Sequence, residues 1–223
     1  EIASCLVGSE MCIRDSYYQW GRKDPFLPSN GLGNINKTWY DKDGTPSTAN
    51  PKVMDLSTGA TCIKNYVLNP NVMHSSLNGD NTYYNLWNVN TTIASRNDDP
   101  VIKTIYDPCP IGFTLPASNA FTGFTVMGDN TTSVSEINGT WDSSKKGWNF
   151  YTNSSKSKTI FFPVSMHRNY SNGELIDTGS GYYASAIPYT VATSRGMEVA
   201  LSFLKPFFNF YRGNGISARP SKE

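Results

Sequence analysis

Residues that serve as metal ligands and nucleophiles are scarce in this sequence. Its 223 residues include two histidines, His74 and His167, and four cysteines. Zinc sites take cysteine and histidine ligands at short spacings, and no such spacing is present. A reactive cysteine needs a nearby histidine or helix N-terminus to lower its pKa, and neither histidine is near Cys109 in the sequence. We therefore expect a protein that is not an enzyme and holds no zinc.

Charged residues and long apolar runs are also few. Asp, Glu, Lys and Arg make up 17% of the chain, and the formal net charge is +1. Nucleic-acid binding usually requires a basic patch or stripe, so charge this weak and scattered predicts no nucleic-acid partner. No apolar run reaches the roughly 18 residues that a transmembrane helix needs, so no membrane span is predicted.

The first sixteen residues differ in origin from the rest of the chain, as their sequence indicates. The segment LVGSEMCIRDS, from Leu6 to Ser16, resembles the translation of a transposon-end sequencing adapter at every position. We interpret residues 1–16 as an adapter-derived artefact that is not part of the fold. Residues 17–223 are expected to form a single domain, in which Cys62 and Cys109 are the remaining cysteines.

The residues that are abundant indicate a loop-rich β protein. Aromatic residues make up 13% of the chain, and short segments such as WNFYT and GYYASAI alternate with Asn-Gly and Gly-Ser-Gly turns. Apolar spacing predicts a short helix over residues 55–66, and Ser118 is a suitable N-cap for another over residues 119–126. The predicted fold class is α+β, with small twisted antiparallel sheets, two short helices and long loops.

A stiff corner surrounds Cys109. The segment IYDPCPIGFTLPAS places this cysteine between Pro108 and Pro110, which fix the backbone and each lack an N–H donor. An oxyanion hole at this corner would be weak, which disfavours catalysis. Two interpretations stay open: Cys109 is a buried thiol that packs, or it forms a disulfide with Cys62, as suits an exported domain. In both, Pro108, Cys109 and Pro110 have a structural role.

Several sequence blocks, in order, resemble one family of bacterial surface proteins. The blocks are YYQWGRKDPF, YNLWN, KTIYDPCPIGF, WNFY, IFFPVSMHR, GELIDTGSGYY and GNGISARP. The segment YDPCPIGFTLP is similar to the Cys-Pro-x-Gly-aromatic-x-x-Pro signature of the Fibrobacter succinogenes major paralogous domain and its relatives, the C-terminal domains of Bacteroidetes fimbrillin-type surface proteins. The resemblance implies a C-type-lectin-like fold and a location that is extracellular or on the outer-membrane surface.

The sequence departs from that family at three places. Ala184 stands where the family has a tryptophan, and Met166 and His167 stand where it has a glycine and an aromatic residue. Many relatives carry a C-terminal cysteine that could pair with the Pro-Cys-Pro cysteine, and the stretch from Ile216 to Arg219 has none. The resemblance therefore does not carry over this disulfide.

Aromatic residues in polar loops are the candidates for ligand binding. Trp39 and Tyr40 lie in the first long loop, and Trp141 lies in the polar segment EINGTWDSSKKG. Such rings, when exposed, stack on the apolar face of a sugar while neighbouring Asn and Asp bind its hydroxyls. The alternative, which is favoured for each ring taken singly, is that the ring anchors its loop to the core. The tryptophans of strand-like blocks, which we expect to be structural, are Trp20, Trp87 and Trp148.

Two acidic turns are weak candidates for calcium. Residues 41–44, DKDG, begin like an EF-hand loop but lack its last glutamate, and residues 97–99, NDD, form a second oxygen-rich turn. Both are better explained as solvated turns, and no cofactor is predicted. Arg219 in the closing block, or Arg22 in the opening block, is expected to form an ion pair with a carboxylate such as Asp107.

These observations predict non-catalytic recognition or adhesion at a bacterial surface, with a glycan or a surface protein as the ligand. Trp39, Tyr40 and Trp141 should then be exposed together in one groove. The alternative is a structural module that assembles with other subunits through an exposed apolar patch or a free strand edge. A third interpretation, an enzyme related to the formylglycine-generating enzymes, requires a pocket that holds Cys109 beside a histidine or a metal.

Overall fold

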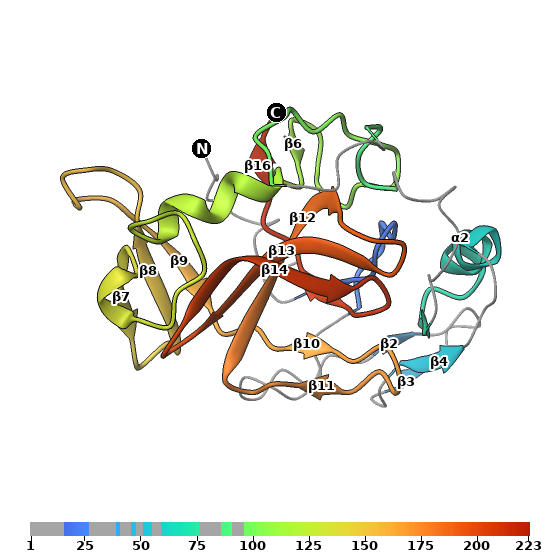
Figure 1. The fold of residues 1–223 in the computed structure, drawn as a ribbon. Coiled ribbons are helices and arrows are strands. Elements are labelled where there is room, and N and C mark those ends of the chain that lie inside the picture. Colours follow the sequence, from blue (N-terminus) through green and yellow to red (C-terminus); the bar gives the residue numbers. More distant parts are fainter. Residues whose placement is uncertain are drawn as a thin grey trace.

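A five-stranded sheet forms the centre of the computed structural model (Figure 1). The structure describes residues 16–26, 39–40, 46–47, 51–54, 59–75, 86–90 and 96–223. The strands, in their order across the sheet, are β1 (Tyr17–Tyr18), β15 (Ile216–Ser217), β12 (Ser180–Pro188), β13 (Thr193–Ala200) and β14 (Leu204–Tyr211). The β12–β15 pair is parallel and the other pairs are antiparallel. Strands from both ends of the sequence thus meet in one sheet.

Alternating side chains let the central sheet bury both of its faces. In β12, Tyr182, Ala184 and Ala186 belong to one hydrophobic cluster, whereas the intervening Tyr183 belongs to another. Successive side chains of a strand point to opposite faces, so this pattern requires apolar cover on both sides. The sheet is therefore the middle layer of the domain.

The second core cluster lies between the central sheet and a smaller antiparallel sheet. The smaller sheet consists of β7 (Gly139–Asp142), β8 (Gly147–Tyr151) and β9 (Thr159–Pro163), and the 3₁₀ helix η2 (Ser118–Phe124) packs beside it. Phe124 of η2 stacks on Phe150 of β8 with ring centroids 4.1 Å apart. The buried members of this cluster are Phe121, Phe124, Ile137, Trp148, Phe150, Ile160, Phe162, Tyr183, Met197, Val199 and Leu204.

The first core cluster covers the opposite face of the central sheet. It gathers residues from the segment after β1, from the helix α2 (Gly59–Leu68) and from the Pro-Cys-Pro corner. Trp20 and Trp87 are in contact, with ring centroids 4.7 Å apart. The buried members of this cluster are Tyr18, Trp20, Cys62, Tyr66, Leu86, Trp87, Cys109, Leu115, Tyr182, Ala184, Ala186, Phe210, Ile216 and Ala218.

Short strand pairs hold the loops around these layers. They are β2 (Trp39–Tyr40) with β3 (Pro46–Ser47), β4 (Lys52–Met54) with β5 (Val72–His74), β6 (Phe113–Thr114) with β16 (Ser221–Lys222), and β10 (His167–Arg168) with β11 (Leu175–Ile176). A further 3₁₀ turn, η3, spans Val134–Glu136. The described chain is thus built mainly of small sheets with few helices, in agreement with the coarse fold class expected from the sequence.

The predicted N-cap of the second helix is wrong. The helix η2 is a 3₁₀ helix, its N-cap is Ala117, and no side chain caps it. The Ser118 hydroxyl instead accepts a hydrogen bond from the Asn97 N–H at 3.0 Å. A serine beside a helix start has several backbone groups within reach, and here the long-range partner is the one it binds.

The carboxylate of Asp107 forms hydrogen bonds with nearby residues of the Pro-Cys-Pro corner. It accepts hydrogen bonds from the Cys109 N–H at 2.7 Å, the Thr114 hydroxyl at 3.0 Å and the Leu115 N–H at 3.0 Å. Prolines on both sides of Cys109 leave the corner few N–H donors, and those of Cys109 and Leu115 both bind this one side chain. The Pro-Cys-Pro corner is therefore held by Asp107 rather than by chemistry at the cysteine.

Backbone carbonyl groups hold the two arginines that were expected to pair with Asp107. Arg22 donates to the Val72 carbonyl oxygen at 3.1 Å, and Arg219 donates to that of Phe161 at 2.7 Å. Burial lowers the pKa of Arg22 to about 10. Neither arginine lies within ion-pair distance of Asp107, and all three residues are in the described chain. The predicted ion pair with Asp107 is therefore wrong.

Candidate functional site

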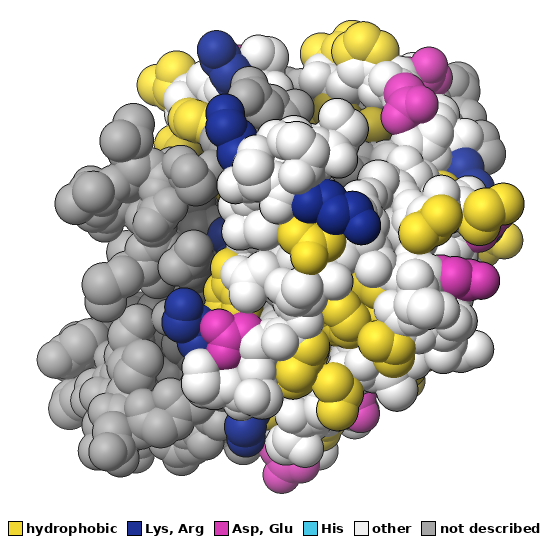
Figure 2. Space-filling view, turned by 90° about the vertical axis from the view of Figure 1, so that its left-hand side faces the viewer, with side chains coloured by type: hydrophobic (Ala, Val, Ile, Leu, Met, Phe, Trp, Pro, Cys, Tyr) yellow, Lys and Arg dark blue, Asp and Glu magenta, His cyan; other side chains and the backbone are white. Residues whose placement is uncertain are grey.

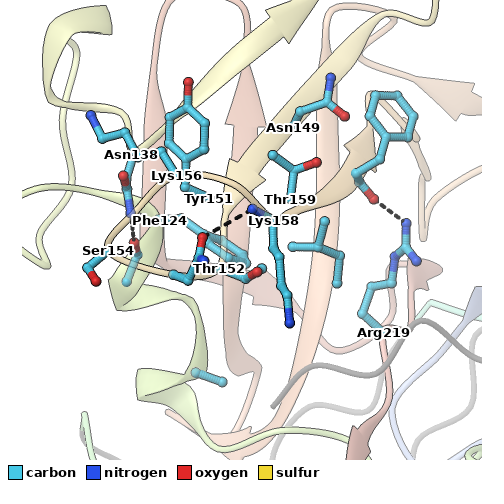
Figure 3. A pocket seen from close by; sticks show the side chains of 15 residues that line it. Phe124, Asn138, Asn149, Tyr151, Thr152, Ser154, Lys156, Lys158, Thr159 and Arg219 are labelled. Atoms are coloured by element: carbon cyan, nitrogen blue, oxygen red, sulfur yellow. Dashed lines mark hydrogen bonds between the residues drawn. The ribbon is translucent and has the colours of Figure 1, made fainter.

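An open groove follows the outer face of the smaller sheet. It lies between η2 and the β8–β9 hairpin with its loop, and its volume is about 1140 Å³. Figure 3 shows Arg219 at one end of the groove and Asn138 and Ser154 at the other. The fifteen lining residues are Ala120, Gly123, Phe124, Asn138, Asn149, Tyr151, Thr152, Asn153, Ser154, Lys156, Lys158, Thr159, Ile160, Phe161 and Arg219.

Strand alternation divides β8 and β9 between the core and the groove. Asn149 and Tyr151 of β8 line the groove, as do Thr159 and Phe161 of β9, whereas their neighbours in both strands belong to the second core cluster; Ile160 alone of these neighbours also reaches the groove. In the strand register, Asn149 lies opposite Phe161 and Tyr151 lies opposite Thr159. Aromatic and polar side chains therefore alternate both along and across the two strands.

The β8–β9 loop, residues 152–158, is built around the Asn153 side chain. Its Oδ1 accepts hydrogen bonds from the N–H groups of Ser157 and Lys158, both at 3.1 Å. Its Nδ2 donates to the hydroxyls of Ser155 at 2.7 Å and Ser157 at 2.9 Å. Lys156 has a φ of 56°, in the left-handed region. Local polar contacts thus hold the lysines of this loop at the rim of the groove.

Asn138 ties the helical wall of the groove to the sheet. Its Nδ2 donates to the Gly123 carbonyl oxygen at 2.9 Å, and its N–H donates to the Phe124 carbonyl oxygen at 2.8 Å. Ala120 and Gly123 form part of this wall, and a Cβ at Gly123 would have no neighbouring atom within 4 Å. Small side chains on the helix therefore leave the groove open.

The charge of the groove has one sign. Lys156, Lys158 and Arg219 line it, and none of the fifteen lining residues, all within the described ranges, is acidic. On the face of the molecule in Figure 2, basic and acidic side chains are scattered among hydrophobic patches and the white backbone and uncharged polar atoms. Three basic groups around one groove are thus a local concentration of positive charge.

The ligand-binding residues expected from the sequence do not form this groove. Trp141 is half-buried in β7 and packs against Trp148, with ring centroids 5.8 Å apart at 70°. Trp39 and Tyr40 form β2, and their side chains lie outside the described part of the structure. Since β7 and β2 lie at opposite ends of the molecule (Figure 1), the three residues are not brought together.

Most residues expected to be structural lie inside the protein. Pro108 is half-buried and Pro110 is exposed. Cys62 and Cys109 are both buried in the first core cluster, and they are not bonded to each other. This placement favours the packing interpretation of Cys109 over the disulfide. The fully or almost fully buried members of the set are Trp20, Trp87, Cys109, Trp148 and Arg219.

The acidic turns show local hydrogen bonding. The Asn97 Oδ1 accepts a hydrogen bond from the Asp99 N–H at 3.1 Å, and Asp98 accepts one from the Asn119 side chain at 3.1 Å. Residues 41–44 lie outside the described residues. Within the described chain, no group of three His, Cys, Asp or Glu side chains is placed to hold a metal ion. None of the helices described there is long and apolar enough to cross a membrane.

A second polar cluster lies outside the groove, around Tyr182 of the central sheet. The Tyr182 hydroxyl is 3.0 Å from the carboxylates of both Asp177 and Glu198. Lys205 pairs with Glu198 at 2.7 Å, and the His167 Nδ1 is 3.2 Å from Asp177. Burial first and Glu198 second raise the pKa of Tyr182, so its hydroxyl stays protonated and donates to one carboxylate at a time. This network ties β12 to β13 and β14.

Sequence reasoning did not identify Tyr151, Phe161 or Lys156 as candidate site residues. One available signal is the alternation in WNFYT and KTIFFP, which predicts a core face and a solvent face for each strand. That alternation does not indicate a groove, because η2 and Arg219 supply its other walls from distant parts of the sequence. Tertiary packing alone creates the site.

Comparison with known proteins adds no further information about the site. No family model matches the chain, and no curated protein or solved structure gives a significant match. Function is therefore argued from the geometry and chemistry of the groove.

Proposed function

We propose that this chain is a non-catalytic recognition domain of a bacterial surface protein that binds a carbohydrate in the groove. The observation that carries the proposal is the outer face of β8 and β9, where Tyr151 and Phe161 alternate with Asn149 and Thr159. Aromatic rings stack on the apolar faces of sugars, and amide and hydroxyl groups exchange hydrogen bonds with sugar hydroxyls. The groove offers both kinds of contact side by side.

The spacing of the two rings suits a chain of sugars better than a single sugar. Tyr151 and Phe161 are diagonal neighbours on adjacent antiparallel strands, a relation that separates positions by about 7–8 Å. One stacked sugar ring does not cover both positions. The polar side chains between the rings then face the hydroxyls of the intervening units.

The walls of the groove are held in place before any ligand arrives. Asn153 fixes the loop on one side, and Asn138 fixes η2 on the other. Because ordering of loops and side chains opposes binding, a site that is already ordered binds more tightly for the same contacts. This feature favours a dedicated binding groove over an incidental surface depression.

The C-type-lectin-like fold and an extracellular or outer-membrane location are part of the same proposal. Their support is the series of blocks similar to fimbrillin-type surface proteins, together with an architecture of small antiparallel sheets and few helices. The position of Cys109 in the first core cluster, away from the groove, supports a non-catalytic role.

A glycan array with matched variants at Gly123 tests the proposal. A side chain at this position enters open space, so Gly123→Ala and Gly123→Trp should both fold, and the indole alone should fill the groove. We expect the full chain and Gly123→Ala to bind the same carbohydrates and Gly123→Trp to lose them. Equal binding by all three proteins, or no binding by the folded full chain, would contradict the proposal.

Exposed isoleucines favour a second candidate, assembly with another subunit. Ile102, Ile105 and Ile111 are 57%, 77% and 99% exposed. The Lys103 ammonium donates a hydrogen bond to the Cys109 carbonyl oxygen at 2.7 Å, and this bond links the two parts of the segment that carries them. Clustered exposed apolar side chains often mark contact surfaces. Sedimentation velocity over a range of concentrations tests self-assembly: an oligomer that Ile105→Ser/Ile111→Ser abolishes supports it, and a monomer throughout contradicts it.

The strand edges are less suited to assembly. Pro206 lies in the edge strand β14. In β9, the carbonyl oxygens of Phe161 and Pro163 accept hydrogen bonds from Arg219 and the Tyr183 hydroxyl. Prolines and occupied backbone groups hinder the addition of another strand. An assembly of this chain would therefore use the isoleucines rather than a sheet edge.

A further inference from the structure

We infer that the groove takes a negatively charged saccharide, one that carries carboxylate or sulfate groups. This inference rests on the proposed function and adds the charge of the ligand to it. Lys156, Lys158 and Arg219 line the groove, and none of the lining residues that the structure describes is acidic. Lys156 and Lys158 have no acidic ion-pair partner among the described residues, so a neutral ligand would leave their charge unmatched.

The charge near the groove is uneven within the chain. The full sequence has a formal net charge of +1, yet the segment from Gly139 to Phe161 contains four lysines and one acidic residue, Asp142. Asp142 does not line the groove, and it lies 3.8 Å from the Lys145 ammonium. The one acidic residue of this segment thus lies outside the groove.

Two of the three aromatic residues that line the groove lie beside a lysine, although Lys145 itself is not among the lining residues. The Lys156 Nζ is 5.3 Å from the ring centroid of Tyr151, and the Lys145 Nζ is 5.8 Å from that of Phe161. A ring with an ammonium group beside it can stack on the apolar face of an acidic sugar while the ammonium binds its anionic substituent. This arrangement occurs on two neighbouring strands, which suits a ligand with repeated acidic units.

Arg219 extends the positive charge to the far end of the groove (Figure 3). Its side chain is 6% exposed, and its guanidinium donates to the Phe161 carbonyl oxygen and lies 4.8 Å from the Phe162 ring centroid. Water screens the charge of such a buried guanidinium less than it screens the charge of a lysine on the surface. A basic group thus lies at this end of the groove as well as at the loop that carries Lys156 and Lys158.

Polysaccharides that share a backbone and differ in charge test the inference. Dextran and a β-linked glucan are each titrated, in neutral, carboxymethylated and sulfated form, into the full chain by isothermal titration calorimetry. We expect the charged forms to bind at least about tenfold more tightly than the neutral forms, with affinity falling as salt is added. The carboxymethylated and sulfated arms show which anionic group is preferred.

Two double variants of equal net charge separate the groove from general electrostatic attraction. Lys145→Gln/Lys156→Asn removes both ring-associated ammonium groups, and asparagine tolerates the left-handed φ at residue 156. Lys52→Gln/Lys64→Gln removes two exposed lysines from β4 and α2. We expect the first variant to lose about tenfold in affinity for the charged forms and the second to stay within about twofold of the unmodified chain.

Several results would overturn the inference. Equal affinity for neutral and charged forms refutes the charge preference but leaves carbohydrate binding in place. Equal losses in the two double variants mean that the attraction is not specific to the groove, and failure to bind any charged form also refutes the inference. If Gly123→Trp in addition changes the binding of no carbohydrate, the proposed function fails together with the inference.

Discussion

The two faces of the β7–β9 sheet share the same strands and differ in what their side chains contact. On the inner face, Phe150 is 0% exposed and stacks on Phe124. On the outer face, Asn149, Tyr151 and Phe161 are half-buried in an open groove. Core packing accounts for the inner residues. The outer face keeps aromatic rings and lysines that the core does not use, and it is therefore the face available to a ligand.

Truncation of the inner face should have the largest effect on stability. Phe150→Ala removes a ring packed against Phe124, Trp148 and Phe162, and we expect the free energy of unfolding to fall by about 3–5 kcal/mol. Urea denaturation measures the change. A loss below about 1 kcal/mol would mean that this face is not a packed core.

A buried histidine beside the first core cluster should make the fold sensitive to acid. His74 is fully buried beside the first core cluster, with its ring centroid 5.2 Å from that of Tyr66. Neither ring nitrogen of His74 has a hydrogen-bond partner in the described chain. Burial first and the Arg22 charge second lower the pKa of His74 to about 4. The folded protein therefore holds this histidine neutral.

Acid should weaken the fold through His74 over a defined range. The unfolded chain protonates its histidines near pH 6.5, so stability is full above this value and declines as the pH falls toward about 4, by up to about 1.4 kcal/mol per pH unit. His74→Phe should remove this part of the decline. Urea denaturation of both proteins at several pH values in this range measures it, and a constant difference between the two proteins would contradict the assignment.

Period-two patterns predict the inner face, because burial of alternate residues has a local signature. The alternating segments WNFYT and KTIFFP have this signature, and β8 and β9 occupy them. Trp141 shows the limit of this reasoning. Its segment is polar in composition, yet pairing places Trp141 opposite Trp148 in the register, where the two rings pack. Register is a property of the folded sheet rather than of either segment.

The outer face could not be predicted as a site, because its walls meet only after folding. Residues of η2, the β8–β9 loop and Arg219 converge there without any motif spacing. The predicted ion pair between an arginine and Asp107 was wrong for a similar reason. Its carboxylate was expected to attract a distant arginine, but the N–H of Cys109 and the hydroxyl of Thr114 are nearer donors.

Removal of the loop scaffold should affect binding more than stability. Asn153→Ala deletes the hydrogen bonds that shape residues 152–158, and we expect unfolding to become easier by about 1 kcal/mol and carbohydrate affinity to fall about tenfold. Asn172→Ala is the matched control, since Asn172 makes similar bonds with Glu174 in an exposed turn away from the groove. Equal affinity losses in the two variants would show that the loop does not position the site.

The most direct test of the account is the substitution Tyr151→Ala, on the opposite face of the same strand as Phe150. Its effect on stability should be the smallest, within about 1 kcal/mol by urea denaturation. Titration of the variant with the carbohydrate that the full chain binds most tightly should show an affinity about tenfold lower. Unchanged affinity in a variant of unchanged stability would contradict the claim that the groove is the binding site.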